Sequence, residues 1–426
     1  MKKRRVLIFP GGTEIGLEIW NALKDLKEIS LFSVGLDIPN HAEFVFKNHE
    51  IIPSITTEYW LKKLNNIIIK WQIQYIFPAH DDVLVALKKN ETKIIAKIIT
   101  SPLKTVTITR SKSETYSYLQ DIISVPKQYT IDNIPSYPVF VKPDKGQGSL
   151  NTMKINKKFE LSNYLDIVKD GIILEYLPGK EYTIDCFSDR NKGLLFCCGR
   201  ERIRIRSGIS MTSESINNDE FYNIAKKITS KLVFHGAWFF QLKETINGNL
   251  KLLEIAPRIS GTMATHRVIG VNFPLLSIYE TEKISSMILT NNYSVRIDRA
   301  LINRYKTSLE YKYVYTDLDD FLILENKVNI NIVKFLYQCY NKNKNIILLT
   351  RHIGDINDFL DKFAISKILF NKIICVDSNK TKSEYIFEKE AIFLDDSFSE
   401  RKDVHIKCGI ATFDSSMIEV LLDERS

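Results

Sequence analysis

One segment near the middle of the chain combines a lysine with glycines in a way that suits phosphate binding. An apolar run ends at Lys142, and a glycine-rich turn follows it in Lys142-Pro143-Asp144-Lys145-Gly146-Gln147-Gly148-Ser149. Such a loop can fold over phosphates with its backbone N–H groups while the lysine neutralises their charge. It is not a Walker loop, because there the lysine follows the glycines. Taken alone, the segment also fits an exposed hairpin with a solvated lysine.

Two later segments supply oxygen ligands. Gln241 lies in an apolar run that begins at Phe239, and Glu254 precedes Ile255-Ala256-Pro257-Arg258. The turn residues Asn247-Gly248 between them predict a hairpin with Gln241 and Glu254 on opposite strands. Magnesium prefers oxygen ligands, so the pair is a candidate magnesium site.

These motifs, with a strand–turn–strand pattern over residues 175–185, follow one another in an order that resembles the ATP-grasp superfamily. The resemblance is to its carbamoyl-phosphate-synthetase-like branch of carboxylate–amine ligases, and it covers residues 1 to about 300. It implies ATP and Mg²⁺ as cofactors. The implied ATP contacts are Lys112 and Lys142 at the phosphates, Gly146 and Gly148 in a mobile loop, Glu175, Tyr176 and Leu177 at the adenine, and Glu181 at the ribose.

The same resemblance assigns magnesium to Gln241 and Glu254 and the transferred phosphoryl group to Arg258. The family usually reads Glu-Ile-Asn-Pro-Arg, and this chain has Ala256 in place of the metal-binding asparagine. Two hypotheses follow. A second magnesium would be held loosely, by water or substrate, or the site would bind nucleotide without turnover.

Four arginines recur at every second residue: Arg200, Arg202, Arg204 and Arg206. On a strand this period places all four on one face. We expect at least one of them to line the cleft as an anion site, with a solvated face or a nucleic-acid stripe as the alternatives. Aromatic residues that would stack on single-stranded nucleic acid do not interleave with them.

A second group of polar residues, near the C-terminus, also suits phosphate chemistry. Asp317 and Asp319 follow a predicted strand, and such a pair can hold magnesium and present one aspartate as a nucleophile toward phosphorus. Strand ends of an open α/β sheet face the ligand crevice. Further polar residues stand at or near the ends of later strands: Thr350, Lys382, Asp395 and Asp396.

This pattern resembles the haloacid dehalogenase (HAD) superfamily of phosphohydrolases over residues 313–426. The resemblance implies Asp317 as nucleophile, Asp319 as general acid/base, and Thr350 and Lys382 as ligands of the phosphoryl oxygens. It also implies a magnesium site made of Asp317, Asp319, Asp395 and Asp396.

Three details qualify this second resemblance. Lys380 is an alternative to Lys382, and Phe321 stands where the family often has threonine or valine. About 30 residues separate Asp319 from Thr350, too few for a helix and a large cap as well. We therefore expect an open site that accepts large or small phosphorylated metabolites.

The elements predicted around these residues give a chain of α/β and α+β class with three domains. Residues 1–110 alternate strands and helices, which predicts a Rossmann-like domain before the ATP-grasp part. Its Pro10-Gly11-Gly12 turn before a helix is either an anion site or a plain tight turn. Residues 111–305 carry short strands joined by turns, as the ATP-grasp domain would, and residues 306–426 predict a Rossmannoid HAD-like domain without a large cap.

The expected helices are 16–26, 59–71 and 220–231. The expected strands are 6–9, 31–35, 75–78, 139–142, 171–176, 182–187, 194–200, 238–244, 250–255, 313–316, 346–350, 372–376, 391–394 and 409–413.

Composition limits the remaining classes of protein. The 426 residues are 44% hydrophobic and 26% charged, which excludes a disordered or collagen-like chain. The net charge of +8 suits anionic small molecules, and we expect neither nucleic acid nor a membrane as partner. Six scattered cysteines without CxxC favour a reduced, cytoplasmic protein.

The combined interpretation is a bifunctional enzyme. Its ATP-grasp part would join a small-molecule carboxylate to an amine through an acyl phosphate, and its HAD-like part would remove phosphate from a related metabolite. The alternatives are a kinase paired with a phosphatase, and a nucleotide-sensing protein with a degenerate site. A homodimer is the candidate oligomeric state.

Overall fold

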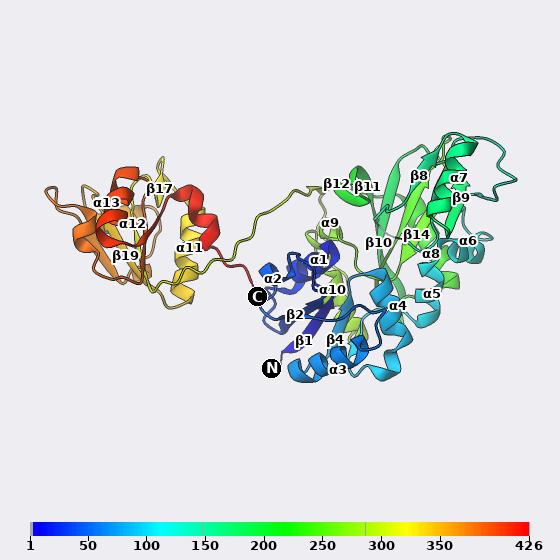
Figure 1. Cartoon of the computed structure of the whole chain (residues 1–426), viewed down its shortest axis with the longest axis horizontal. Helices are drawn as coiled ribbons and strands as arrows, with labels where there is room; N and C mark the ends of the chain where they lie inside the picture. Colours follow the sequence, from blue (N-terminus) through cyan, green and yellow to red (C-terminus); the bar gives the residue numbers. More distant parts are fainter. Residues whose placement is uncertain (1–2, 147, 286, 426) are drawn as a thin grey trace. The chain divides into compact units, whose positions relative to one another are not determined.

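The computed structural model describes residues 3–146, 148–285 and 287–425, and its internal contacts divide the chain into two units (Figure 1). Unit 1 comprises Met1–Leu301 with Arg425–Ser426, and unit 2 comprises Ile302–Glu424. The division falls four residues before the expected boundary at 305/306. The expected boundary near residue 110 lies inside unit 1 and stays a prediction.

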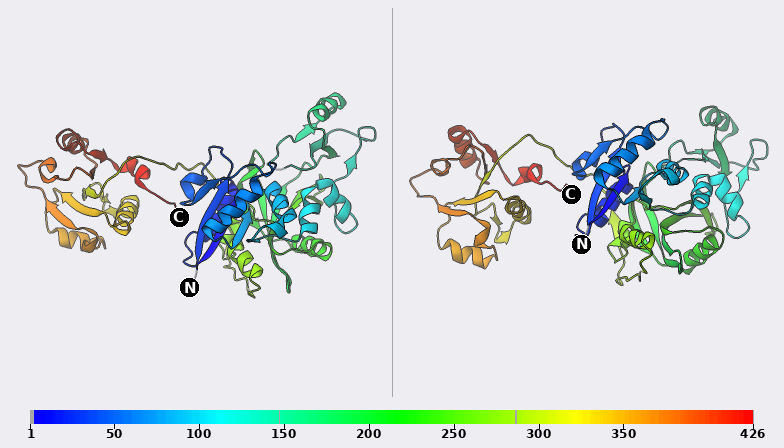
Figure 2. Two further views of the ribbon diagram at one scale, coloured as in Figure 1. Left: turned by 60° about the horizontal axis from the view of Figure 1, so that its bottom comes forward. Right: turned by 90° about the horizontal axis from the view of Figure 1, so that it is seen from below.

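Unit 1 begins with a parallel five-stranded sheet in the order β3-β2-β1-β4-β5. Its strands are β1 (Arg4–Phe9), β2 (Ile29–Gly35), β3 (His49–Ile51), β4 (Tyr75–Pro78) and β5 (Lys97–Ile98). Alternate side chains of β1 face opposite cores, so α1 (Glu14–Leu23) covers one face of the sheet. Helices α3 (Trp60–Trp71) and α4 (Asp81–Lys89) cover the other face (Figure 2), and α2 (Ala42–Val45) and η1 (Glu91–Lys93) complete this region.

Helices α5 (Leu103–Arg110) and α6 (Lys112–Leu119) lead into a four-stranded sheet in the order β6-β9-β7-β8. Its strands are β6 (Gln128–Tyr129), β7 (Val139–Pro143), β8 (Met153–Ile155) and β9 (Gly171–Glu175). Helix α7 (Lys158–Ile167) packs on this sheet through Leu161 and Tyr164. The glycine-rich segment connects β7 to β8.

A six-stranded antiparallel sheet, in the order β14-β13-β10-β11-β12-β15, completes unit 1. Its strands are β10 (Glu181–Asp189), β11 (Gly193–Arg206), β12 (Ile209–Ile216), β13 (Gly236–Glu244), β14 (Leu250–Ala256) and β15 (Arg296–Asp298). Helix α8 (Asp219–Lys231) packs on it through Phe221, Ala225 and Ile228. Helices α9 (Ala264–Arg267) and α10 (Phe273–Thr281) follow β14.

The hairpin expected around Asn247-Gly248 is confirmed, because β13 and β14 pair with Gln241 opposite Glu254. The expectation that the four arginines of β11 share one face is wrong. The pairing of β11 with β12 shifts register between Arg202 and Arg204 and again before Ile205, which breaks the period of two. Strand β12 was not expected, because its polar sequence ISMTSESI lacks an apolar run.

Unit 2 contains a parallel five-stranded sheet in the order β20-β19-β16-β21-β22. Its strands are β16 (Tyr313–Thr316), β19 (Asn345–Thr350), β20 (Lys372–Cys375), β21 (Ala391–Leu394) and β22 (Ala411–Phe413). Helices α11 (Ile330–Asn341) and α12 (Ile356–Lys362) pack into the core on one face, and α13 (Phe398–Cys408) packs into the core on the other. The short elements are β17 (Ile323–Leu324), β18 (Lys327–Val328), η2 (Lys367–Leu369), η3 (Lys382–Tyr385) and η4 (Ser415–Leu421).

The last strand of unit 2 begins later than expected, for a local reason. The strand expected from Gly409 begins at Ala411, because Gly409 ends α13 in the left-handed conformation with φ 68°. Between Asp320 and α11 the chain forms only the β17–β18 hairpin. Among the described residues, no helix combines the length and apolar character needed to cross a lipid bilayer.

Candidate active sites

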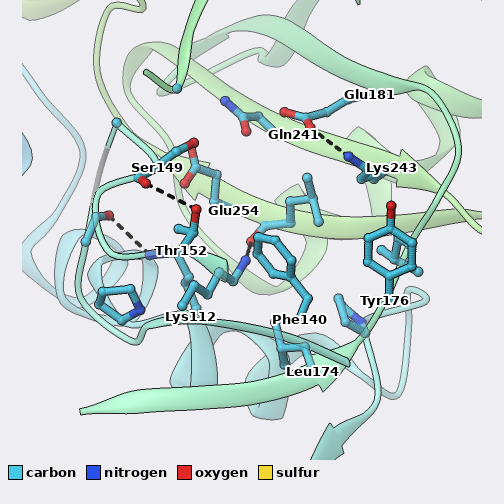
Figure 3. Close-up of a pocket in the computed structure, with 18 of the residues that line it drawn as sticks. Lys112, Phe140, Ser149, Thr152, Leu174, Tyr176, Glu181, Gln241, Lys243 and Glu254 are labelled. Carbon is cyan, nitrogen blue, oxygen red and sulfur yellow. Dashed lines mark hydrogen bonds and ion pairs between the residues drawn. The ribbon is translucent and has the colours of Figure 1, made fainter. Parts of the chain in front are cut away.

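A pocket in unit 1, called here the first pocket, lies between the four-stranded and six-stranded sheets (Figure 3). Its apolar wall includes side chains of the four-stranded sheet and the segment after it, namely Phe140, Leu174, Tyr176 and Leu177. The opposite wall carries polar side chains of the six-stranded sheet, including Glu181, Gln241 and Lys243. One apolar wall facing one polar wall suits a flat ring system attached to a charged group.

Lys142 stands at the end of β7 and is 7% exposed. Its Nζ donates to the Tyr116 hydroxyl at 3.0 Å and to the Leu253 carbonyl at 3.4 Å, and neither acceptor is a carboxylate. Burial, together with the charge of Lys112, lowers the pKa of Lys142 to about 7. Among the described residues no carboxylate forms an ion pair with Lys142, and an anionic ligand would favour its charged form.

Lys112 opens α6 and fixes the glycine-rich segment. Its Nζ donates to the carbonyls of Asp144 and Gly146 at 3.3 and 3.1 Å. Gly148 has φ 63°, and a Cβ on Gly208 would lie 2.2 Å from the Gly148 carbonyl carbon. Side chains are therefore excluded where this segment meets the turn between β11 and β12. Gln147 lies outside the described residues.

The two acidic residues expected at the nucleoside are already paired. Glu175 accepts a hydrogen bond from the Lys127 N–H at 2.7 Å and forms an ion pair with Lys251. Glu181 forms ion pairs with Arg202 and Lys243. Tyr176 and Leu177 follow β9 on the pocket wall, so the structure brings the expected ATP residues together.

Gln241 and Glu254 stand opposite each other on β13 and β14. Gln241 Oε1 accepts from Arg202 Nη1 at 3.1 Å. Within the described ranges, no group donates a hydrogen bond to the Glu254 carboxylate, so its oxygens are available to a ligand. Their oxygen chemistry fits the magnesium ion expected there.

Gln241 and Glu254 also line a second pocket in unit 1, defined here by Thr13, Glu14, His80, Arg200, Arg258, Ser260, Thr262 and Arg299. Arg258 lines this second pocket and not the first. Asp81 holds its guanidinium with two hydrogen bonds of 2.6 and 2.7 Å. Burial alone would raise the pKa of Asp81, but the Arg258 charge lowers it to about 2. Arg258 is therefore a fixed positive charge.

The Pro10-Gly11-Gly12 turn is closely packed. A Cβ on Gly11 would lie 2.6 Å from Ser33 Cβ, and one on Gly12 would lie 2.2 Å from the Asn40 side chain. Thr13 caps α1 by accepting from the Gly16 N–H, and Thr13 and Glu14 reach the second pocket. Ala256 is 6% exposed within the apolar core beside Phe239, so it offers no ligand.

Of the four arginines on β11, Arg200 and Arg202 face the second pocket. Arg200 is buried against Asp185, with Nε 2.9 Å from Oδ2. Arg204 and Arg206 are exposed beyond the register shift, and Arg204 pairs with Asp298.

In unit 2, three carboxylates gather at the ends of β16 and β21. Asp317, Asp395 and Asp396 offer oxygen atoms within 4.8 Å of one another. Oδ1 of Asp317 is buried, and no residue that the structure describes donates a hydrogen bond to it. Such an orphaned acceptor fits the magnesium ion expected there.

Lys382 opens η3 and is 2% exposed. Its Nζ lies 2.9 Å from Asp317 Oδ2 and 2.6 Å from Asp395 Oδ2. Burial lowers the pKa of Lys382, but the two carboxylates raise it above its ordinary value. Burial raises the pKa of Asp395 to about 6. The alternative Lys380 is exposed and pairs with Asp377 at 3.2 Å, away from this group.

Asp319 does not join the carboxylate group found among the described residues. Its two oxygens lie 3.0 Å from Nδ1 of His352, two residues after the buried Thr350 at the end of β19. The sequence predicted Asp319 as a magnesium ligand. Its side chain instead contacts His352 and lies outside the group of Asp317, Asp395 and Asp396. Phe321 is fully buried in the core.

Sequence reasoning missed three residues that shape these sites. Asp81 follows β4 closely, so the strand-end rule that found Asp317 could have found it. Tyr116 and His352 act through contacts made only in the folded chain, and nothing in their sequence context marks them.

Comparisons with known proteins agree with this geometry. A family model described as "ATP-grasp in the biosynthetic pathway with Ter operon" matches residues 168–299. No curated protein sequence matches the chain. Three solved structures are similar in fold to about two thirds of the chain.

The biotin carboxylase domain of the Hydrogenobacter thermophilus 2-oxoglutarate carboxylase, solved with MgADP, ADP and bicarbonate, is 14% identical with a TM-score of 0.55, covering 69% of this chain and 71% of its own. N5-carboxyaminoimidazole synthetase from Staphylococcus aureus, complexed with ADP, is 16% identical with a TM-score of 0.56, and the match covers 68% of this chain and 81% of the synthetase chain. L-amino acid ligase from Bacillus licheniformis is 15% identical with a TM-score of 0.53, and the match covers 68% of this chain and 76% of the ligase chain. At these identities the likeness shows the fold, which is that of ATP-grasp proteins.

Proposed function

We propose that unit 1 is an ATP-dependent carboxylate–amine ligase that acts through an acyl phosphate. The observation that carries this proposal is the shared wall of the two pockets. Gln241 and Glu254 line both, Lys142 lies only in the first, and Arg258 lies only in the second. A phosphoryl group held at that wall can pass from a nucleotide on one side to an acceptor on the other.

In this proposal the adenine lies against Phe140, Tyr176 and Leu177, and the phosphates reach Lys142 and Lys112. Gln241 and Glu254 would hold Mg²⁺, which would supply positive charge to neutralise the phosphates and polarise the transferred group. Two structural relatives were solved with ADP, one of them with magnesium, which supports these ligands.

The acceptor carboxylate attacks the γ-phosphorus from the second pocket, and the bond between that phosphorus and the oxygen bridging it to the β-phosphorus breaks. The Arg258 guanidinium, fixed by Asp81, lies where it stabilises charge on the transferred group. The products are ADP and an acyl phosphate. An amine then attacks the acyl carbon, phosphate leaves, and an amide forms after loss of a proton.

Carboxylate-dependent ADP release tests the ligase proposal. Purified protein with MgATP should release ADP when a panel of carboxylates and amines includes the correct pair. Glu254→Gln should lower that rate strongly, because it removes a charged oxygen ligand, whereas Glu244→Gln on the same hairpin should not. A Glu254→Gln variant that releases ADP as fast as the wild type would contradict the proposal.

A specific observation favours a second activity in unit 2, magnesium-dependent phosphate-ester hydrolysis of the HAD type. The support is the group of Asp317, Asp395 and Asp396 around Lys382, with Thr350 at the adjacent strand end. Asp317 would attack phosphorus and form an aspartyl phosphate, while Asp319 gives a proton to the leaving alcohol. Water would then release phosphate and restore Asp317. Lys382 and Thr350 would hold the phosphoryl oxygens.

A further inference from the structure

The second pocket of unit 1 is lined by four arginines, and three of them are already paired with carboxylates. Arg200 pairs with Asp185, Arg202 with Glu181, and Arg258 with Asp81. Asp185 also contacts Nδ1 of His266 and accepts a hydrogen bond from the Ser260 hydroxyl. A carboxylate of the chain is therefore in direct contact with each of these three arginines.

Arg299, one residue beyond β15, is the exception. Its backbone N–H donates to the Met211 carbonyl at 2.9 Å, which fixes the residue beside β12. Its Nη1 makes only long contacts, 3.4 Å to the Ser210 carbonyl and 3.5 Å to Thr262 Oγ1. In the part of the chain that the structure describes, no carboxylate forms an ion pair with it. Burial lowers the pKa of Arg299, as expected for a partly desolvated cation that lacks a close counter-ion.

The two acidic residues that influence the pKa of Arg299, Glu14 and Glu18, form no ion pair with its guanidinium. Glu18 is engaged by Arg267, with hydrogen bonds of 2.7 and 3.3 Å. Glu14 faces the pocket, packs against Gly261, and raises the pKa of both Arg258 and Arg299 without an ion pair to either. The Arg299 guanidinium therefore presents free N–H donors to the pocket. The negative charge of Glu14, in the same pocket, would repel an anion that binds there.

We propose that the second pocket binds an acceptor with two anionic groups, of which one reacts beside Arg258 and Glu254 and the other pairs with Arg299. This inference rests on the proposed ligase function and names the substrate class of that site. The second group is a carboxylate or a phosphate monoester, since a guanidinium binds either with paired N–H donors. A monocarboxylate acceptor of the same length leaves Arg299 without an ion-pair partner.

The test compares matched probes by isothermal titration in the presence of MgADP. The probes are glutarate and 3-phosphoglycerate, each with two anionic groups, and butyrate, with one. The wild-type protein should bind one or both dianionic probes more tightly than butyrate. Arg299→Gln should weaken that binding about ten- to a hundredfold, as expected for loss of a charge-assisted contact, and should leave butyrate unchanged.

Two further variants separate charge from folding. Arg296 lies three residues before Arg299, is exposed, and makes a long ion pair of 3.8 Å with Glu214, so Arg296→Gln should bind every probe as the wild type does. Glu14→Gln should tighten dianion binding, because it removes the opposing charge. A preference for one dianionic probe then tells the carboxylate from the phosphate ester.

Equal dianion binding by wild-type and Arg299→Gln protein overturns the inference, and so does failure of wild-type protein to prefer a dianionic probe. MgADP titration in the same samples separates failure of the dianion proposal from failure of the ligase proposal. If MgADP binds and no dianion does, only the acceptor class is wrong, whereas absence of MgADP binding contradicts the ligase proposal itself.

Discussion

Each unit of the chain has a buried lysine at its candidate site, and the two lysines have opposite surroundings. Lys142 in unit 1 donates to a tyrosine hydroxyl and a carbonyl, and burial lowers its pKa to about 7. Lys382 in unit 2 lies between two carboxylates at 2.9 and 2.6 Å, and its pKa is raised despite burial. Among the described residues, the lysine thus has no carboxylate in direct contact in unit 1, whereas in unit 2 it is the centre of a charged cluster.

The difference shows what each site requires from a ligand. In the first pocket no carboxylate that the structure describes forms an ion pair with Lys142, so a bound phosphate would be its first direct anionic partner. In unit 2 the protein already supplies the anions around Lys382, and the buried Oδ1 of Asp317 still lacks a partner among the described residues. That site calls for a cation, and a phosphate ester could approach once the cation balances the carboxylates.

The largest effect expected from this comparison is loss of hydrolysis in unit 2. Asp317→Asn should lower magnesium-dependent hydrolysis of p-nitrophenyl phosphate by about a thousandfold or more, because an amide cannot attack phosphorus. Asp320→Asn, at an exposed neighbouring position, is the matched control and should retain activity. Asp317→Asn should still bind MgADP. Phosphatase activity that survives in it would mean that another residue is the nucleophile.

Removing the central lysine of unit 2 should cost stability. Lys382→Met leaves Asp317 and Asp395 as buried carboxylates without a cation, which typically destabilises a domain by about 3–5 kcal/mol. Calorimetry should show a lower unfolding temperature for the transition of unit 2. All four tryptophans lie at positions 20, 60, 71 and 238, in unit 1, so tryptophan fluorescence should report an unchanged transition there. Lys380→Met is the exposed control, and an equal effect from both variants would contradict the assignment.

Removing the buried lysine of unit 1 should weaken nucleotide binding. Lys142→Ala should weaken MgADP binding by about 1.5–3 kcal/mol, roughly ten- to a hundredfold, when titrated near pH 6.5. Lys145→Ala, in the same segment but exposed, should change affinity far less. Unaltered MgADP affinity in the Lys142 variant would remove this lysine from the phosphate site.

The smallest effect expected is a pH dependence of nucleotide binding. Because the pKa of Lys142 is about 7 in the free protein, the lysine is largely neutral above that pH. Phosphates favour its charged form, so binding takes up a proton and MgADP affinity should fall above pH 7, by at most about tenfold per pH unit. Lys142→Arg keeps its charge and should flatten this dependence. A wild-type affinity that is constant from pH 6 to 9 would show that Lys142 is already charged.

The sequence was most informative where a residue's role depends on its place along a strand. Gln241 and Glu254 were matched correctly because a turn signal and two apolar runs fix a hairpin register. Asp317 and Asp395 were expected to meet because they follow strands, which the structure places as neighbours in one parallel sheet. In these cases local pattern determines position in space.

Prediction failed where position depends on packing between distant segments. The register shifts in β11 bring Arg200 and Arg202 to the pocket and turn Arg204 and Arg206 to solvent, and the alternating sequence does not reveal them. Arg299 comes to the second pocket only because β15 pairs with β12, a strand too polar to be expected. The contact of Asp319 with His352 likewise joins the ends of two strands through side chains alone.

The most direct test of the central claim is to trap the intermediate of unit 1 with hydroxylamine. MgATP, a carboxylate that stimulates ADP release, and hydroxylamine in place of the amine should yield the hydroxamate of that carboxylate, identified by mass spectrometry. Glu254→Gln should abolish the hydroxamate, and Asp317→Asn should leave it unchanged. A phosphorylated alcohol formed with ADP, with no hydroxamate from any carboxylate, would contradict the ligase account and favour a kinase.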